Sequence, residues 1–422
     1  MHSVTNAIPT GTIASIPAKA HAHRALICAA LASSPSTILL SRTSKDIDAT
    51  MDSLRGLGAH VVYENKIVTV TPGPAPAKGN VVPHESGTTL RLLLPVAASI
   101  CNDVDVDAKG RLPDRPLEPM LGEMKAHGVT FSQDKPPFTM TGRLQGGNFS
   151  MVGDVSSQFF SGLLLAAPQI GLSTITSTTP LQSSDYVTLT TETMRDFGVE
   201  VEHTLPDTNI NEAFTVPFGA SFIGRDNYQI EGDWSNAAIW MVAAGMTGKP
   251  ITITGMNKNS VQADRRIMQV MIDAGCDVIW DGMNVTVTGR ASKPIHADLE
   301  QMPDMLPVMA ALACSISGES SFVKGARLRL KESDRLVAVA NLVRDLGGTV
   351  REEGDDLYII GSGILKGGHG DCVNDHRLVM AGTLMALISE NPVTLQDSES
   401  ITKSYPHFFE DWNLLGGNAQ PV

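Results

Sequence analysis

The sequence predicts a mixed α/β protein built from six copies of one structural unit. Two repeated signals support this prediction. Six apolar runs rich in Ala, Leu and Met each follow polar residues that can begin a helix, and six Gly residues each follow an amphipathic pattern at helical spacing. Because short β-rich runs stand between these signals, one unit consists of a strand, a helix, a Gly, two strands and a buried helix.

The six apolar runs predict helices buried inside a globule, because they are apolar on every side and too short to span a membrane. They cover residues 25–31, 90–100, 159–167, 237–246, 305–316 and 378–388. A helix N-terminus exposes unpaired N–H groups and about half a positive charge, so several such ends brought together would bind anions. Ser, Asp and Asn at these positions are also ordinary caps. Capping does not call for Arg24, Arg91 or Arg377, which stand at three of these starts.

Each amphipathic helix is expected to end at a Gly in the left-handed conformation. These residues recur every 69 to 77 positions and are Gly58, Gly128, Gly198, Gly275, Gly347 and Gly416. Strands are expected before and after each helix, for example at 250–254, 276–280 and 285–288. A doubly wound Rossmann sheet repeats roughly every 30 residues, and no Gly-x-Gly-x-x-Gly follows a strand, so the sequence argues against that fold.

Composition indicates a soluble cytoplasmic enzyme. The chain has 422 residues, 42% of them hydrophobic, and a net charge of −13, which disfavours nucleic acid or an anionic membrane as a partner. Five scattered Cys without metal-ligand spacing are expected to be reduced core residues. No signal peptide is expected at the N-terminus. In so acidic a chain, a small anion can bind only where cations cluster locally.

Such clustering occurs at Arg327 to Arg335 and again at Asn374 to Arg377, where cations stand beside acids at the ends of apolar segments. A solvated charged face would explain one such stretch. The recurrence of comparable sets favours a site for phosphates and carboxylates, since guanidinium groups pair with both in a bidentate way.

Ten motifs in order make the whole chain resemble the 5-enolpyruvylshikimate-3-phosphate synthase family. They are Lys19 to Arg24, Ser86 to Thr88 with Arg91, Arg111 to Pro116, Val155 to Phe159, Ser183 with Tyr186, Glu231 to Asp233, Pro303-Asp304, Arg327 to Arg335, Asn374 to Arg377, and Thr402-Lys403. The resemblance implies the two-globule enolpyruvyl transferase fold, with three βαβαββ units and buried parallel helices in each globule. We expect one globule at 1–18 plus 232–422 and the other at 19–231.

The resemblance also implies a reaction. The family transfers the enolpyruvyl group of phosphoenolpyruvate to the 5-hydroxyl of shikimate 3-phosphate through a tetrahedral intermediate, releases phosphate, and serves chorismate and aromatic amino-acid biosynthesis. It implies no cofactor or metal, a site completed when the two globules close, and a phosphoenolpyruvate pocket that accepts glyphosate. We expect a monomer whose partners are these two small substrates, not nucleic acid or a membrane.

Site residues follow from the motif positions. The resemblance implies as acid/base candidates Lys19, Asp304, Glu332 and His376. It implies for shikimate 3-phosphate Lys19, Arg24, Ser156, Ser157, Gln158, Ser183, Tyr186, Asp304 and Lys331. It implies for phosphoenolpyruvate Lys19, Gly87, Arg115, Gln158, Arg335, Arg377 and Lys403.

Structural interpretations stay open for four of these residues. Tyr186 fits a packed ring, Ser183 a turn, His376 a structural histidine and Asp304 a helix cap. The chain also departs from the family pattern. Ala18 and Ala20 replace two serines beside Lys19, Leu92 stands where many members have Pro, and Glu85 adds a carboxylate near the phosphoenolpyruvate pocket, where Arg327 could pair with it.

Two other functions compete with this interpretation. The sister enzyme that uses UDP-N-acetylglucosamine carries a reactive cysteine in the loop corresponding to Arg111 to Pro116, and no cysteine lies there. A non-catalytic anion-binding paralogue would fit Ala20 and Glu85. The joint presence of Lys19, Asp304, Glu332 and Arg335 argues against it.

Overall fold

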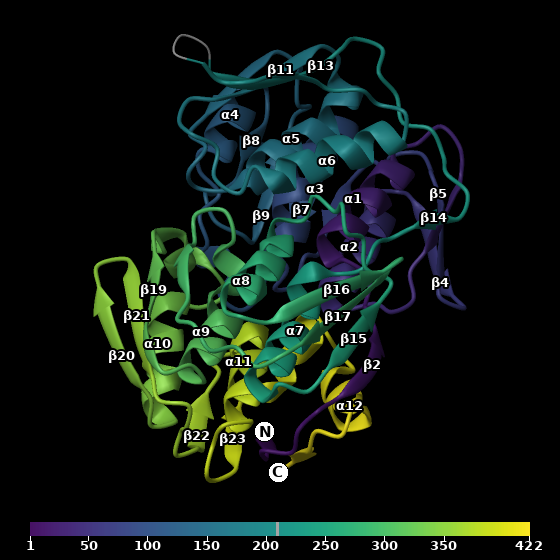
Figure 1. The fold of residues 1–422 in the computed structure, drawn as a ribbon. Coiled ribbons are helices and arrows are strands. Elements are labelled where there is room, and N and C mark those ends of the chain that lie inside the picture. Colours follow the sequence, from purple (N-terminus) through teal and green to yellow (C-terminus); the bar gives the residue numbers. More distant parts are fainter. Residues whose placement is uncertain (208–210) are drawn as a thin grey trace. The chain divides into compact units, whose positions relative to one another are not determined.

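The computed structural model describes residues 1–207 and 211–422, which form two compact units (Figure 1). Unit 1 comprises Met1–Ile16 and Glu231–Val422, and unit 2 comprises Pro17–Ile230. Each unit has a continuous apolar core of its own. The N-terminal strands therefore belong to the same unit as the C-terminal half of the chain.

All six apolar runs form helices, which confirms that prediction. In unit 2 they are α1 (Lys19–Ala30), α3 (Gly87–Ile100) and α5 (Ser157–Ile170), and in unit 1 they are α7 (Trp234–Thr247), α9 (Leu306–Cys314) and α11 (His376–Ala386). Most of their residues are buried on every side. Within each unit the buried helices pack on one another, α3 against α5 and α9 against α11.

The amphipathic helices are also present, and each ends just before its expected Gly. They are α2 (Lys45–Gly56), α4 (Met120–Ala126), α6 (Asp185–Asp196), α8 (Ile267–Asp273), α10 (Arg335–Asp345) and α12 (Phe408–Leu414). The six glycines have φ between +87° and +104°, a region that residues with a Cβ rarely adopt. Short 3₁₀ helices complete the set: η1 (Leu112–Asp114), η2 (Ala263–Arg266), η3 (Pro303–Met305), η4 (Ala326–Leu330) and η5 (Ser398–Lys403).

Among the described residues, each unit carries three four-stranded sheets, and every sheet combines one parallel pair with two antiparallel pairs. The strands of unit 1 are β1 (His2–Val4), β2 (Gly11–Ala14), β15 (Ile251–Thr254), β16 (Asp277–Asp281), β17 (Asn284–Thr288), β18 (His296–Asp298), β19 (Gly318–Val323), β20 (Thr349–Glu353), β21 (Asp356–Gly361), β22 (Gly368–Asp371), β23 (Val393–Gln396) and β24 (Ala419–Pro421). Their sheets have the orders β22-β23-β1-β24, β16-β17-β15-β2 and β18-β19-β21-β20.

The strands of unit 2 are β3 (Ser36–Leu39), β4 (His60–Glu64), β5 (Ile67–Thr71), β6 (Gly79–Val81), β7 (Asp103–Val106), β8 (Thr130–Phe131), β9 (Phe138–Thr141), β10 (Asn148–Met151), β11 (Ser173–Ser177), β12 (Glu202–Thr204), β13 (Glu212–Val216) and β14 (Tyr228–Gln229). Their sheets have the orders β10-β11-β13-β12, β14-β3-β5-β4 and β6-β7-β9-β8. Alternation fixes which face of a sheet is buried: in unit 1, Ile251 and Ile253 lie opposite Val287 and Val285, and all four side chains enter the core.

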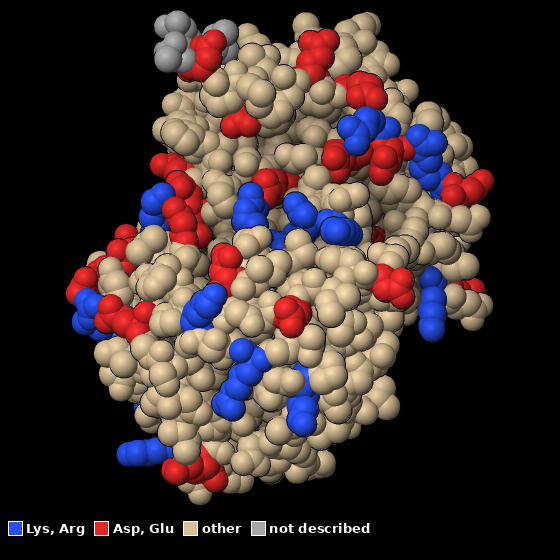
Figure 2. Space-filling view, in the orientation of Figure 1, with Lys and Arg blue, Asp and Glu red and all other residues tan. Residues whose placement is uncertain are grey.

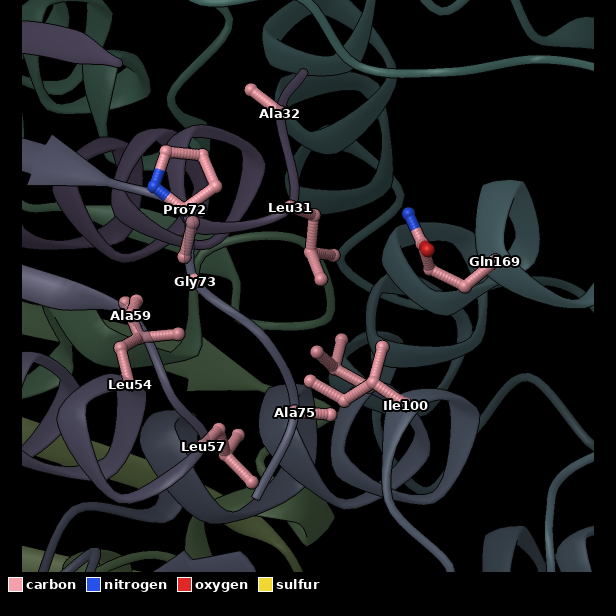
Figure 3. A pocket seen from close by; sticks show the side chains of 12 residues that line it. Leu31, Ala32, Leu54, Leu57, Ala59, Pro72, Gly73, Ala75, Ile100 and Gln169 are labelled. Carbon is pink, nitrogen blue, oxygen red and sulfur yellow. The ribbon is translucent and has the colours of Figure 1, made fainter. Parts of the chain in front are cut away.

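A cavity of about 160 Å³ lies in unit 2 at the C-terminal ends of three buried helices (Figure 3). Leu31 closes α1 there, and Ile100 and Gln169 are the last or nearly the last residues of α3 and α5. Gln169 is the one polar residue in the lining. Because three C-terminal ends meet at one cavity, these helices run in the same direction. Their N-termini, with Lys19, Gly87 and Ser157, therefore lie at the other end of the unit.

Charged side chains on the face of unit 1 drawn in Figure 2 stand mostly singly or beside a charge of opposite sign. Within residues 1–207 and 211–422, no helix combines the length and apolar character needed to cross a bilayer.

Candidate active-site residues in the two units

Unit 1 gathers charged side chains around Arg335, the first residue of α10, which is only 1% exposed. Its Nε donates to Asp375 at 2.9 Å, its Nη1 to Asp304 at 2.7 Å, and its Nη2 to Glu332 at 2.6 Å and to Asp375 at 3.2 Å. Burial alone would lower the pKa of Arg335, but the three carboxylates outweigh it and raise that pKa. Four of its five N–H groups are used, which leaves one hydrogen on Nη1. We call Asp304, Lys331, Glu332, Arg335, Asp375 and Arg377 the Arg335 cluster.

Asp304 lies in η3, directly before α9, and its carboxylate meets three cations. The distances are 3.2 Å to Lys331, 2.7 Å to Arg335 and 3.5 Å to Arg377. Burial raises the pKa of Asp304, yet Lys331, Arg377 and Arg335 together hold it well below its ordinary value. Asp304 is therefore ionised in the absence of ligand, and the carboxylate occupies positions where a substrate anion could pair with the same cations.

Asp375 was quoted within a motif but was not assigned a role from the sequence. It is fully buried, accepts a hydrogen bond from Ser333 at 3.0 Å, and caps α11 through the backbone N–H of Arg377 at 3.0 Å. Burial raises its pKa, and Arg335 more than compensates, so that the pKa of Asp375 lies below its usual value. The Asp375 carboxylate therefore holds two arginines: it binds the guanidinium group of Arg335 and the backbone N–H of Arg377.

Lys331 follows η4, and its ammonium group has a lowered pKa. Burial, together with the positive charges of Arg327 and Arg335 nearby, lowers the pKa of Lys331 to about 8. The Asp304 carboxylate acts in the opposite direction. The side chain of Lys331 is 19% exposed, so a ligand can contact it. A lysine with this pKa changes its charge within the range in which enzymes operate.

The remaining predicted residues of unit 1 lie around α11. Arg377 is 11% exposed and also donates to the backbone carbonyl of Asp304 at 3.3 Å. Lys403, at the end of η5, donates to the carbonyl of Asn374 at 2.8 Å. His376 is buried, 4.0 Å from the Asp375 carboxylate, which fits the structural interpretation as well as a functional one.

Asp264 in η2 was missed from the sequence, where an Asp in the run Ala-Asp-Arg-Arg carries no special signal. It is 1% exposed; one carboxyl oxygen accepts from Ser235, and the other has no partner among the described residues. Burial raises the pKa of Asp264 to about 6, with Arg377 lowering it and Asp304 raising it. Asp264 therefore belongs to the electrostatic surroundings of Arg377.

In unit 2, Lys19 begins α1 and forms an ion pair of 2.7 Å with Asp46 of α2. Both side chains are partly exposed. The cap position of α1 is Ala18, whose side chain cannot accept a hydrogen bond from the helix. The first backbone N–H groups of α1 therefore have no side-chain cap, an arrangement that suits a phosphate.

Arg24, predicted to bind shikimate 3-phosphate, lies in the interior of unit 2 with 1% exposure. Its Nε donates to Thr190 at 2.7 Å, its Nη1 to the carbonyl of Ala20 at 2.7 Å, and its Nη2 to Ser161 and the carbonyl of Tyr186 at 3.2 and 3.0 Å. No carboxylate is among these partners, and burial lowers the pKa of Arg24 to about 10. Like Arg335, it keeps one Nη1 hydrogen for a ligand.

The start of α3 brings together three further predictions. A Cβ added to Gly87 would lie 2.6 Å from Nη1 of Arg115, so the guanidinium lies directly against this glycine. Gln158 accepts from Arg91 at 3.0 Å and donates to Thr88 at 2.9 Å. Arg91, buried over the ring of Phe159, also donates to the carbonyl of Pro116 at 3.0 Å and so supports the loop that carries Arg115.

Ser156, Ser157, Ser183 and Tyr186 lie at the starts of α5 and α6. Ser156 caps α5 by accepting from the backbone of Gln158 at 3.3 Å. Ser183 has φ +54°, which places it in a turn, and Tyr186 is half-buried in the first turn of α6. Glu85, a departure from the family pattern, lies against the backbone of Gly110. Its predicted pairing with Arg327, a residue of unit 1, stays a prediction.

The chain is similar to known proteins over nearly its whole length. The family model described as EPSP synthase (3-phosphoshikimate 1-carboxyvinyltransferase) matches residues 7–412. The chain is 36% identical over 406 residues to the 3-phosphoshikimate 1-carboxyvinyltransferase of Clostridium kluyveri, covering 95% of this chain and 94% of that one. It is 34% identical to the protein of the same name from Methanocorpusculum labreanum, with 97% of each covered.

Solved structures show the same fold. An EPSP synthase from Acinetobacter baumannii superposes with a TM-score of 0.80 at 23% sequence identity, covering 100% of this chain and 99% of that one.

Proposed function

This chain belongs to the EPSP synthase (3-phosphoshikimate 1-carboxyvinyltransferase) family, and we propose how its residues divide the work of the family's reaction. The enzyme transfers the enolpyruvyl group of phosphoenolpyruvate to the 5-hydroxyl of shikimate 3-phosphate and releases phosphate. The observation that carries the assignment of residues is the gathering of Lys331, Arg335 and Arg377 around Asp304 in a chain of net charge −13.

Binding is assigned to the cations and hydroxyl groups. Phosphoenolpyruvate is bound by Arg115, Gln158 and the Gly87 backbone of unit 2 and by Arg335, Arg377 and Lys403 of unit 1. Shikimate 3-phosphate is bound by Lys331, Arg24, Gln158, Ser183, Tyr186 and the two serines at the start of α5. Arg24 and Arg335 act mainly as buried positive charges, because each has a single N–H left for a ligand.

Chemistry is assigned to three residues. Asp304 accepts the proton of the 5-hydroxyl as that oxygen attacks the enol carbon, and Glu332 with Lys19 delivers a proton to the methylene group. The tetrahedral intermediate then loses phosphate together with a proton from its new methyl group, which restores the carbon–carbon double bond and completes the transfer. The low pKa of Asp304 in the ligand-free state makes it a weak base. Its pKa is expected to rise when the substrate anions draw Lys331 and Arg377 away.

The assay that tests the function measures phosphate release from phosphoenolpyruvate with shikimate 3-phosphate and, in parallel, with UDP-N-acetylglucosamine. Release with the first acceptor alone is expected. Release with the second would instead favour the sister enzyme, and release with neither would favour a non-catalytic paralogue.

We further propose that units 1 and 2 act as two globules that close when both substrates bind, that the protein acts as a monomer, and that it works in the cytoplasm. Binding residues from both halves of the chain support the first proposal, and five buried free cysteines support a reducing compartment. Small-angle scattering with and without both substrates measures compaction and mass together, and unchanged dimensions would contradict closure.

Fractionation of the producing cells tests the proposed cytoplasmic location. Recovery of the protein outside the cytosol would contradict it.

Lys331 predicts the pH dependence of shikimate 3-phosphate binding. Its ammonium form is present below the lowered pKa of about 8 and is lost as pH rises through it. We therefore expect kcat/KM for shikimate 3-phosphate to fall above about pH 8, since this parameter reports the free enzyme. Lys331→Arg, which keeps its charge, should remove that fall. Below about pH 8, Lys331→Met should raise KM for shikimate 3-phosphate with little change in kcat, and a kcat effect without a KM effect would reject the assignment.

Gly87 predicts the response to glyphosate. The methyl group of Gly87→Ala requires the Arg115 guanidinium to move, since the two would lie 2.6 Å apart. Glyphosate, with the longer chain of atoms, is crowded more than phosphoenolpyruvate. We expect a glyphosate-sensitive parent and an inhibition constant at least about tenfold higher in Gly87→Ala, the usual effect of one methyl group in a tight pocket. Gly122→Ala in α4 is the matched control. A parent that resists millimolar glyphosate while binding phosphoenolpyruvate normally would overturn this expectation.

A further inference from the structure

A chain of buried hydrogen bonds joins α1, α2 and α3 of unit 2, and none of its members was assigned a role above. His23 Nδ1 lies 2.6 Å from Thr50 Oγ1, which lies 2.7 Å from Thr89 Oγ1. The hydroxyl of Thr89 donates to Ser86 Oγ at 2.8 Å and to the carbonyl of Asp46 at 3.3 Å. His23, Thr50 and Thr89 are 0% exposed and Ser86 is 2% exposed. The chain therefore runs without solvent from the middle of α1 to the residue before Gly87.

The donors and acceptors of this hydrogen-bond chain can be assigned in only one way, because each threonine carries a single hydroxyl hydrogen. Thr89 uses its hydrogen toward Ser86 and Asp46, so the hydrogen between the two threonines must come from Thr50. Thr50 then has none left for His23, and Nδ1 of His23 must be the donor. The imidazole is therefore in the Nδ1–H form, with its lone pair on Nε2.

His23 is held in that neutral form by its surroundings. Burial, with the positive charges of Lys19 and Arg24, lowers the pKa of His23 well below its ordinary value. Its Nε2 has no hydrogen-bond partner among residues 1–207 and 211–422. A buried acceptor without a partner costs about 1–3 kcal/mol, which an apolar side chain of similar size would avoid. The donor on Nδ1 is therefore the useful part of this side chain.

The other end of the hydrogen-bond chain lies at Ser86, beside the proposed phosphoenolpyruvate site. Ser86 caps α3, and its Oγ accepts both the backbone N–H of Thr89, at 3.2 Å, and the Thr89 hydroxyl. No described residue accepts the hydroxyl hydrogen of Ser86 itself. Because the chain fills both acceptor positions of this oxygen, the hydrogen is left for an anion bound beside Gly87. The same chain is tied to Asp46, whose carboxylate holds Lys19 at 2.7 Å.

We propose that His23, Thr50 and Thr89 are positioning residues for phosphoenolpyruvate binding, which act by fixing Ser86 and the Gly87 backbone and by directing the Ser86 hydroxyl hydrogen to the ligand. This inference rests on the proposed function. It assigns to Ser86 a direct contact with the substrate and to His23 an action through two hydroxyl groups.

Steady-state kinetics on Thr89→Val, Ser86→Ala and the double variant tests the proposal. Ser86→Ala should raise KM for phosphoenolpyruvate by at least about tenfold, the effect of losing one hydrogen bond to a charged group, and Thr89→Val should raise it by about three- to tenfold. In each variant kcat should change by less than about twofold. The double variant should resemble Ser86→Ala, since the chain acts through that hydroxyl. Thr193→Val removes another buried hydroxyl of unit 2, bonded only to the carbonyl of Leu189 at 2.7 Å, and should leave both parameters unchanged.

Two outcomes would overturn the proposal. If the effects of Thr89→Val and Ser86→Ala on KM multiply in the double variant, or are no larger than that of Thr193→Val, the buried hydrogen bonds serve only packing. Nitrogen NMR of labelled His23 in the parent protein does not depend on any variant. It should show a protonated Nδ1 and an unprotonated Nε2 at neutral pH, and a protonated Nε2 would reverse the direction of the hydrogen-bond chain. A parent that fails to release phosphate would instead reject the proposed function.

Discussion

Arg335→Leu is expected to destabilise unit 1 by about 3–5 kcal/mol, the cost of removing one partner from a buried ion pair. The guanidinium is 1% exposed and donates to Asp304, Glu332 and Asp375. Its loss leaves Asp375, which is fully buried, without its principal counter-charge. Urea unfolding followed by a probe in unit 1, such as the fluorescence of Trp240, measures the difference from the parent.

Two further variants separate charge from packing in this experiment. Asp375→Asn added to Arg335→Leu should recover part of the loss, because it removes the uncompensated charge. Arg344→Leu, on the exposed face of the same helix, breaks a pair with Glu352 of 2.8 Å between largely exposed groups and should cost less than about 1 kcal/mol.

The stability deficit of Arg335→Leu is also expected to depend on pH in a definite direction. Without Arg335, burial raises the folded pKa of Asp375 above its unfolded value, so the protonated form is favoured on folding. The stability deficit of Arg335→Leu should therefore shrink as pH falls from about 8 to about 5. A deficit that is equal at both pH values, or that the Asp375→Asn change deepens, would show that packing and not charge accounts for the loss.

The fold was predictable because its signals are local. An apolar run such as 237–246 must be buried on every side, and Gly275 ends a helix through its own φ of +100°. Both properties act within a few residues, so they survive without knowledge of tertiary contacts. The six-fold recurrence of these two signals then predicts the repeated unit.

The sequence could indicate which residues are candidates for the site, but not how they contact one another. Charge and motif order selected Arg335, but they could not show that Asp375, forty positions later in the chain, would bind the same guanidinium. They also could not show that Arg24 uses four N–H groups inside the protein. Asp264 gave no signal, because its role depends on its burial beside Arg377 and Asp304. These are long-range contacts that only the folded chain creates.

Asp304→Ala is expected to lower kcat by about 10²- to 10⁴-fold, the usual contribution of a general base. Its KM values should change little or fall, because the carboxylate that is lost pairs with Lys331, Arg335 and Arg377 and so competes with the substrate anions. Glu332→Gln should likewise act on kcat, whereas a Lys19 variant should change both parameters, since its ammonium group binds anions and carries a proton.

Asp304→Asn and Asp298→Asn complete the test of Asp304. Asn keeps the size of the side chain and an acceptor oxygen but cannot take the proton, so Asp304→Asn should be as slow as Asp304→Ala. Asp298 pairs with Lys324 at 2.7 Å, is 47% exposed and belongs to the same unit, and its variant should have parental kcat. A near-parental kcat in Asp304→Ala would demote Asp304 to a structural residue at the start of α9. A slow Asp304→Ala beside a fast Asp304→Asn would show that its hydrogen bonding, not its basicity, supports the reaction.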